Sequence, residues 1–153
     1  MIKDSGNRRT FDTGAVRDID DQKGRPTLMP LRVVARLLCE RMGGDYILDQ
    51  IAAFTEDGDT AHLYRVLRKF ATIAYEGQLE TMILEVAIHY SDGCAKYGED
   101  NWKKGIPVNC YLDSAIRHYL KFQRGDNDEP HDRAFVWNIM CCIWEVDYHN
   151  DKN

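Results

Sequence analysis

The sequence predicts an all-α protein, a single-domain helical bundle with an extended N-terminal arm. Two segments carry this prediction. Over residues 78–97, apolar side chains recur every three or four positions, which is the spacing of an amphipathic helix. Residues 134–146 are apolar on almost every side, as expected for a helix at the centre of a bundle. No segment shows the strict alternation of a half-buried strand, so we expect no sheet.

A chain of 153 residues is long enough for one domain with its own core. Residues 1–27 are polar, contain three glycines and have no amphipathic period, so they are predicted to be an extended arm. The arm also carries Phe11, Val16 and Ile19, which suggests that it packs on the body. The domain proper is expected to cover residues 28–148, and residues 149–153 form a tail.

Breakers and apolar periodicity divide the domain into six expected helices. Glycines end several of them, and a proline at the first turn begins the last. The expected helices cover residues 28–42, 46–54, 60–74, 78–97, 111–123 and 130–148. Residues 99–110 are expected to form a loop.

Charge and cysteine content exclude several classes of function. The formal charge of −5 disfavours a non-specific nucleic-acid binder, because such proteins usually carry a positive excess. A phosphorylated substrate would therefore need local basic residues or bridging cations. The five cysteines are an odd number without a CxxC motif, which favours buried, reduced thiols. No apolar run is long enough for a membrane span, so we expect a cytoplasmic protein.

Two clusters offer ligands for hard cations. Glu85, His89 and Asp92 share one face of the predicted helix 78–97, where they could hold Mg²⁺ or Mn²⁺. A solvated helix face is the commoner outcome of this spacing. Residues 126–132, DNDEPHD, contain five possible ligands. Helix capping and the helix dipole explain the acidic residues there equally well.

Three further features could contact a nucleotide, and each has a structural alternative. Arg117 beside His118 suits a phosphate group, but Arg117 could instead pair with Asp113 one helical turn away. Asn138 lies inside an apolar run and must bond either to another helix or to a ligand. Trp102 could stack on a base or simply plug the end of the bundle.

The order of these motifs resembles the phage and bacterial dATP/dGTP diphosphohydrolase family, which is similar in turn to the MazG-like all-α nucleotide pyrophosphohydrolases. The resemblance covers the arm and residues 80–146, whereas residues 43–77 look like an insertion with no assigned role. It is carried by TGAxRD from Thr13, KGRPxLxP from Lys23, Glu85, KYGxxNWxxG from Lys96, LDSAxRH from Leu112, GDxDExH from Gly125 and Trp137-Asn138. The ExxE…ExxD motif of ordinary MazG-like enzymes is not recognisable in this sequence.

The resemblance implies hydrolysis of a purine deoxynucleoside triphosphate, dGTP or dATP, to the monophosphate and pyrophosphate. It implies two or more Mg²⁺ or Mn²⁺ ions, and a role in remodelling the nucleotide pool of a phage host. The implied metal ligands are Glu85, Asp92, Asp113, Asp128 and Glu129, and the implied catalytic residues are Glu85, Glu129 and His118. The implied substrate contacts are Arg17, Lys23, Arg25, Lys96, Asn101, Trp102, Lys103, Arg117, His131 and Asn138. MazG-like relatives commonly assemble, so a homo-oligomer is also expected.

Two other functions compete with this one. A helical nucleotide sensor could use the same pocket without catalysis, and it would bind nucleotides without converting them. A phosphohydrolase of the HD type is weaker, because His131-Asp132 is the one His-Asp dipeptide in the sequence.

Overall fold

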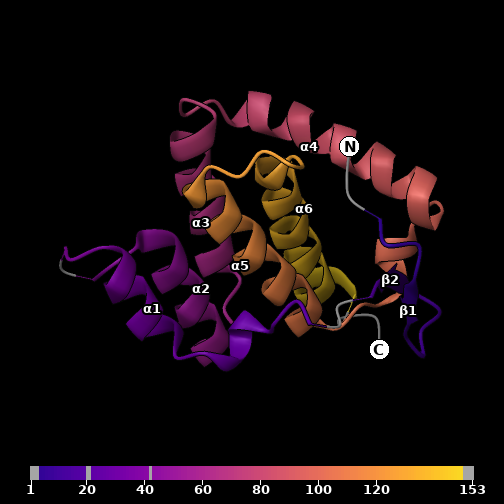
Figure 1. Ribbon diagram of the computed structural model, residues 1–153, viewed down its shortest axis with the longest axis horizontal. Coiled ribbons are helices and arrows are strands. Elements are labelled where there is room, and N and C mark those ends of the chain that lie inside the picture. Colours follow the sequence, from indigo (N-terminus) through magenta and orange to yellow (C-terminus); the bar gives the residue numbers. More distant parts are fainter. Residues whose placement is uncertain (1–3, 20–21, 42, 150–153) are drawn as a thin grey trace.

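The computed structural model describes residues 4–19, 22–41 and 43–149. The described chain is mainly α-helical, which confirms the predicted fold class (Figure 1). The α-helices are α1 Leu31–Leu38, α2 Tyr46–Asp57, α3 Ala61–Ala74, α4 Leu79–Tyr97, α5 Val108–Arg124 and α6 His131–Trp144. None of the helices in the described ranges is both long and apolar enough to cross a membrane. Of the predicted tail, residues 150–153 lie outside the described residues.

Helix α6 lies at the centre of the bundle, as its all-round apolar sequence predicts. It packs against α3, α4 and α5, and residues 134–139 are buried without a break (Figure 1). The helix continues into a π-helical turn, Glu145–His149. Because α6 is surrounded, the polar residues along it face other elements rather than solvent.

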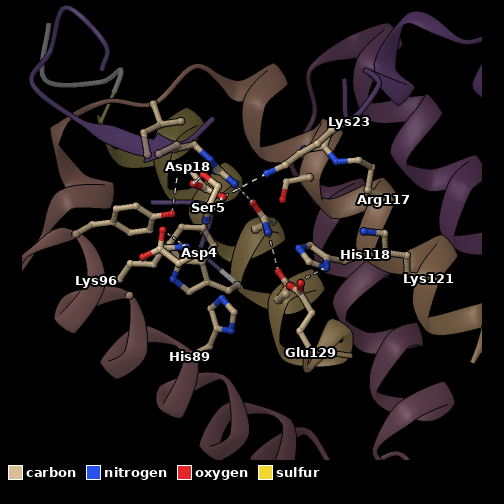
Figure 2. Close-up of a pocket in the computed structure, with 18 of the residues that line it drawn as sticks. Asp4, Ser5, Asp18, Lys23, His89, Lys96, Arg117, His118, Lys121 and Glu129 are labelled. Carbon is tan, nitrogen blue, oxygen red and sulfur yellow. Dashed lines mark hydrogen bonds and ion pairs between the residues drawn. The ribbon is translucent and has the colours of Figure 1, made fainter. Parts of the chain in front are cut away.

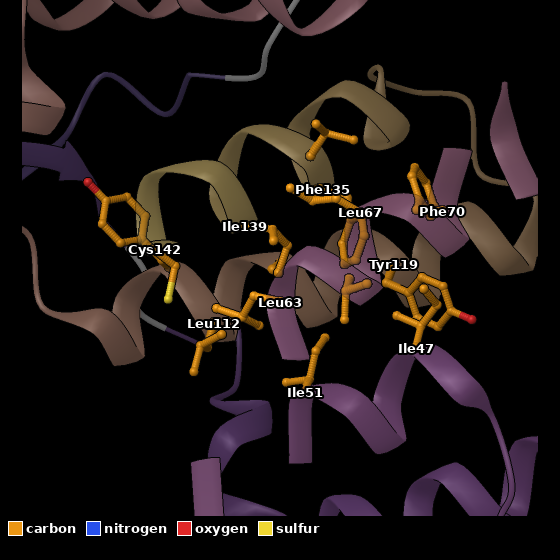
Figure 3. Packing of buried hydrophobic residues seen from close by; sticks show 14 of the residues in the cluster. Ile47, Ile51, Leu63, Leu67, Phe70, Leu112, Tyr119, Phe135, Ile139 and Cys142 are labelled. Carbon is orange, nitrogen blue, oxygen red and sulfur yellow. The ribbon is translucent and has the colours of Figure 1, made fainter. Parts of the chain in front are cut away.

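The helices α2 and α3 lie in the segment that the family resemblance suggested to be an insertion, and they supply a large part of the core. Their buried apolar side chains pack against those of α5 and α6 (Figure 3). Phe70 of α3 is fully buried, and its ring centroid lies 4.6 Å from Phe135, 5.3 Å from Phe122 and 6.4 Å from Tyr119. The segment is therefore integral to the fold.

Helix α1 is shorter than the predicted residues 28–42 at both ends. Residues Pro26–Leu28 form a 3-10 helix, and Met29 is extended because it precedes Pro30. After Leu38 the chain turns back on α1, where the N–H of Asp45 donates to the carbonyl of Ala35 at 2.8 Å. A Cβ on Gly44 would stand 2.7 Å from that Ala35 carbonyl, so this return requires glycine.

The arm contains a two-stranded antiparallel sheet, and the expectation of no sheet was wrong. The strands β1 Arg8–Thr10 and β2 Val16–Asp18 pair with Arg9 opposite Arg17. Their sequences are short and charged, so neither shows an alternating apolar pattern.

Contacts with the body hold the hairpin in place. The side-chain amide of Asn101 accepts from the N–H of Val16 at 2.9 Å and donates to the carbonyl of Val16 at 2.8 Å. It thus satisfies both backbone groups of Val16, as a neighbouring strand would. The hydroxyl of Thr13 donates to the carbonyl of Gly105 at 2.5 Å. Ala15 is fully buried, and Phe11 packs on the core. The arm is thus anchored at the end of α4 and in the loop that follows.

The buried line of α4 differs from the predicted apolar stripe. Met82, Val86 and His89 face the bundle, whereas Ile83 of the predicted stripe is half exposed. Towards its C-terminus the inner face of α4 therefore becomes polar. The five cysteines form no disulfide, but only Cys141 and Cys142 are buried, so the predicted burial is wrong for Cys39, Cys94 and Cys110.

Candidate active site

A cavity of about 820 Å³ opens between the arm, α4, α5 and α6 (Figure 2). Eight of the predicted site residues line it: Arg17, Lys23, Lys96, Asn101, Arg117, His118, Glu129 and Asn138. These residues come from the arm, from α4, α5 and α6, and from the segments that follow α4 and precede α6. The fold therefore brings the motifs of the arm together with those of the C-terminal half.

The cavity is basic although the protein as a whole is acidic. Arg117, Lys121 and Arg124 line it from α5, at spacings of four and three that place them on one helix face. Lys96 adds a charge from α4, and the arm contributes two more. Against these six cationic side chains stand the carboxylates of Asp4, Asp18 and Glu129, and Arg124 is also paired with Asp126 just outside the lining. The local excess of positive charge favours an anionic ligand.

The arm closes one side of the cavity through specific contacts. Arg117 donates to the carbonyl of Gly24 at 2.6 Å, and the ammonium of Lys23 lies 3.6 Å from a carboxylate oxygen of Asp18. The N–H of Asp18 donates to the hydroxyl of Tyr97 at 3.1 Å. These contacts hold Lys23 at the cavity beside Arg117 of α5.

Two histidines and two carboxylates meet where α5 passes the start of α6. His131 is buried, and its Nε2 lies 2.7 Å from Oδ1 of Asp128. Its Nδ1 lies 2.9 Å from Nδ1 of His118, which is 3.9 Å from Oε1 of Glu129 (Figure 2). Because a carboxylate only accepts, a neutral His131 carries its proton on Nε2 and accepts a hydrogen bond from His118. This arrangement leaves Nε2 of His118 unprotonated.

Burial lowers the pKa of His118 well below its ordinary value, and the charge on a protonated His131 would lower it further. The ring of His118 is therefore neutral near pH 7. A neutral imidazole at the edge of a basic cavity can accept a proton or coordinate a cation.

The same residues include the possible metal donors of the described chain. Ligand atoms of His118, Glu129 and His131 lie within 4.8 Å of one another, as do those of Asp126, Asp128 and His131. Two of the predicted metal ligands, Asp128 and Glu129, therefore belong to these donor groups. Glu85 and Asp92, by contrast, are half-buried on α4 and do not line the cavity.

Asp113, also a predicted metal ligand, binds residues at the end of the arm instead. It is buried, and its two oxygens accept from the N–H of Thr27 at 2.8 Å and from Nε of Arg25 at 3.2 Å. Arg25, a predicted substrate contact, is therefore bound to α5 outside the cavity lining. This pair ties the end of the arm to α5, just before Arg117.

Trp102 and Lys103 also lie away from the main cavity. The Trp102 ring packs edge-on against Trp144 at 5.0 Å and Tyr90 at 5.6 Å, so it plugs the end of the bundle. The ammonium of Lys103 lies 5.3 Å from the centre of that ring and 3.4 Å from Asp100. Of the two interpretations of Trp102, the structural one fits these contacts.

Sequence reasoning grouped Lys121 with Arg117 and His118 but assigned it no contact, and it did not name Arg124 or Trp137 as site residues. Arg124 could have been found, because Arg117, Lys121 and Arg124 follow helical spacing. Trp137 stands beside Asn138 in the last of the family motifs, but an aromatic residue in a buried helix is ordinarily a core residue.

His89 makes the stability of the protein depend on pH. Burial lowers its pKa to about 4, and the charge of Arg133 contributes in the same direction. As pH falls through 6.5, the unfolded chain binds a proton that the folded chain refuses, so stability is lost. From pH 7 to pH 5 we expect His89 alone to remove about 2 kcal/mol from the free energy of unfolding.

Urea denaturation at both pH values checks this prediction. His89→Asn is expected to lose about 2 kcal/mol less than the parent protein over the same interval. Equal losses in the two proteins would show that His89 is not held neutral.

Comparison with known protein families gives a match over the C-terminal part of the chain. A family model described as "dATP/dGTP diphosphohydrolase, N-terminal" matches residues 68–153, which is more than half of the chain. The match includes α4, α5 and α6, and so three of the four walls of the cavity. No curated protein and no solved structure matches the chain.

Proposed function

Because the chain belongs to the dATP/dGTP diphosphohydrolase family, we propose that its cavity binds a purine deoxynucleoside triphosphate and hydrolyses it between the α- and β-phosphates. The products are the deoxynucleoside monophosphate and pyrophosphate. The observation that carries this proposal is the convergence of six cationic side chains on one cavity that also presents His118 and Glu129.

The basic wall suits the triphosphate. Arg117, Lys121 and Arg124 form a row along α5, and such a row can follow a chain of phosphates. Lys23 of the arm lies next to Arg117, which donates to the carbonyl of Gly24 (Figure 2). A triphosphate along this row would be held at several points, which fixes the α-phosphorus relative to His118 and Glu129.

Glu129 and His118 are the groups that can take a proton from the attacking water. The water oxygen forms a bond to the α-phosphorus, and the bond from that phosphorus to the bridging oxygen breaks. The electron pair leaves with pyrophosphate, and the water proton passes to the Glu129 carboxylate or to Nε2 of His118. His131 and Asp128 then act as positioning residues, because they set the tautomer of His118.

We further propose that Mn²⁺ or Mg²⁺ can bind at this group. The donor atoms of His118, Glu129 and His131 lie within 4.8 Å of one another and would hold the ion in place of the hydrogen bond between the two rings, and the two imidazoles favour Mn²⁺. With the ion bound, these residues would be its ligands, and the ion would lower the pKa of the attacking water. A bound divalent ion would neutralise phosphate charge and polarise the α-phosphorus. We expect this reaction to remodel the purine deoxynucleotide pool in the cytoplasm of a bacterium that hosts a phage.

The test is to supply the purified protein with each of the four deoxynucleoside triphosphates and Mn²⁺ or Mg²⁺. We expect pyrophosphate from dGTP or dATP, and none after chelation with EDTA. Release of single phosphates or of intact triphosphate would contradict the reaction. Nucleotides that raise the melting temperature but remain intact would indicate a sensor instead.

A further inference from the structure

Three buried polar atoms on one wall of the cavity lack hydrogen-bond partners within the described part of the chain. They are Nη1 of Arg17, Nε1 of Trp137 and Nδ1 of His89. All three residues line the cavity. His89 is 7% exposed and Trp137 is 9% exposed, so water reaches neither side chain freely.

Unpaired polar atoms of this kind are rare in folded proteins, because a buried donor without an acceptor loses its hydrogen bond to water and gains nothing in return. Three of them around one cavity indicate a ligand that pairs with them. The other guanidinium nitrogen of Arg17, Nη2, already donates to Oδ1 of Asn138 at 3.3 Å. The partner of Nη1 must therefore come from the cavity.

Aromatic contacts hold these groups in a fixed arrangement. The guanidinium carbon of Arg17 lies 5.4 Å from the ring centre of Tyr111 and 5.7 Å from that of Trp137. The rings of His89 and Trp137 are 5.6 Å apart. Arg17 is thus clamped against two aromatic faces, and its free N–H direction is set before any ligand binds.

This wall is suited to a base rather than to phosphates. His89 is neutral at pH 7, because burial lowers its pKa to about 4, so Arg17 is the one charged group among the three. The phosphate-binding cations Arg117 and Lys121 lie across the cavity from His89 (Figure 2). Aromatic walls with a few fixed polar groups are typical of sites that bind planar ligands.

The free groups of Arg17 and Trp137 are both donors, so the edge that they contact must present two acceptors. Guanine offers such an edge with its N7 and O6. Adenine offers N7 but carries an amino group, which is a donor, at position 6. Pyrimidines have no N7.

We propose that Arg17 and Trp137 bind the N7 and O6 edge of guanine, and that they make this protein prefer guanine over adenine nucleotides. The proposal rests on the function proposed above, since it assigns the base end of the same cavity. Because Nη2 of Arg17 is held by Asn138, Arg17 donates through Nη1 to N7, and the indole N–H of Trp137 donates to O6.

The experiment measures dissociation constants for α,β-methylene analogues of the nucleotides, which are not hydrolysed at the α–β linkage. The analogue of dGTP is expected to bind about 10-fold more tightly than that of dATP. The analogue of dITP, which keeps N7 and O6, should match that of dGTP. Replacing N7 by carbon, as in the 7-deazaguanine analogue, should weaken binding about 10-fold.

The variant Trp137→Phe removes the indole N–H and keeps an aromatic ring. It is expected to weaken binding of the dGTP analogue about 10-fold and to leave that of the dATP analogue within about threefold. Trp144→Phe is the matched control, because Trp144 is a half-buried residue of α6 that does not line the cavity. It should change neither constant.

Equal binding of the dGTP and dATP analogues would overturn the proposal, as would full affinity for the 7-deaza analogue. Both results come from the parent protein, so they hold even if Trp137→Phe fails to fold. Neither would affect the proposed function as long as pyrophosphate is released from the natural triphosphates. Absence of that release would overturn the proposed function itself.

Discussion

The variant Glu129→Gln is expected to lower kcat for pyrophosphate release by about 100- to 10,000-fold, the range that a general acid or base contributes. Glu129 lines the cavity and lies 3.9 Å from His118. The amide has nearly the same shape as the carboxylate but cannot take a proton. Steady-state kinetics with dGTP and Mn²⁺ measure the effect.

Glu99→Gln is the control for this variant, because Glu99 is exposed in the loop after α4 and outside the cavity lining. Its kcat should equal that of the parent. The family resemblance places a catalytic role at Glu85 as well. If Glu85→Gln abolishes turnover and Glu129→Gln does not, the reacting atoms lie on α4 and our placement of the reaction is wrong.

The variant Phe70→Ala is expected to lower the free energy of unfolding by about 3–5 kcal/mol. Phe70 is fully buried where α3 meets α5 and α6, and four aromatic rings surround it (Figure 3). Removal of its side chain leaves a cavity that α3, α5 and α6 cannot close, because each of these helices also packs against other elements. Urea denaturation monitored by circular dichroism gives the change.

Leu84→Ala provides the comparison, since Leu84 is 71% exposed on the outer side of α4. We expect a change within about 0.5 kcal/mol. If Phe70→Ala cost no more than Leu84→Ala, then α3 would not share the core described here.

The helices were predictable because each depends on a local pattern. The central position of α6 followed from its apolar residues on all sides, and Gly98 and Gly125 end α4 and α5 as expected. The hairpin was not predictable in this way. Its strands are three residues long, and Asn101 and Tyr97 hold the second strand through bonds that span about 80 positions of sequence. No local signal encodes contacts of that kind.

The site was predictable where a motif places its residues on one helix face or in the arm. Arg17, Lys23, Lys96 and Arg117 reach the cavity as the resemblance implies. Asp113 does not, because its partners in residues 25–27 satisfy both of its oxygens. A sequence shows that a carboxylate is present, but its partner depends on which distant segment folds over it.

The net charge was a poor guide to the site. It left open whether local basic residues or bridging cations would offset the charge of a phosphorylated ligand, and the cavity itself carries twice as many cationic side chains as carboxylates. Charge summed over a chain does not describe the field at one place, because the fold decides where each charge lies.

Hydrolysis of dGTP in water enriched in ¹⁸O tests the central claim most directly, because the label marks the phosphorus that is attacked. With Glu129 and His118 beside the α-phosphate, we expect one ¹⁸O atom in dGMP and none in pyrophosphate, as read by mass spectrometry. Label in pyrophosphate or in inorganic phosphate would place the attack on another phosphorus and would contradict the arrangement of base, phosphates and proton acceptor described above.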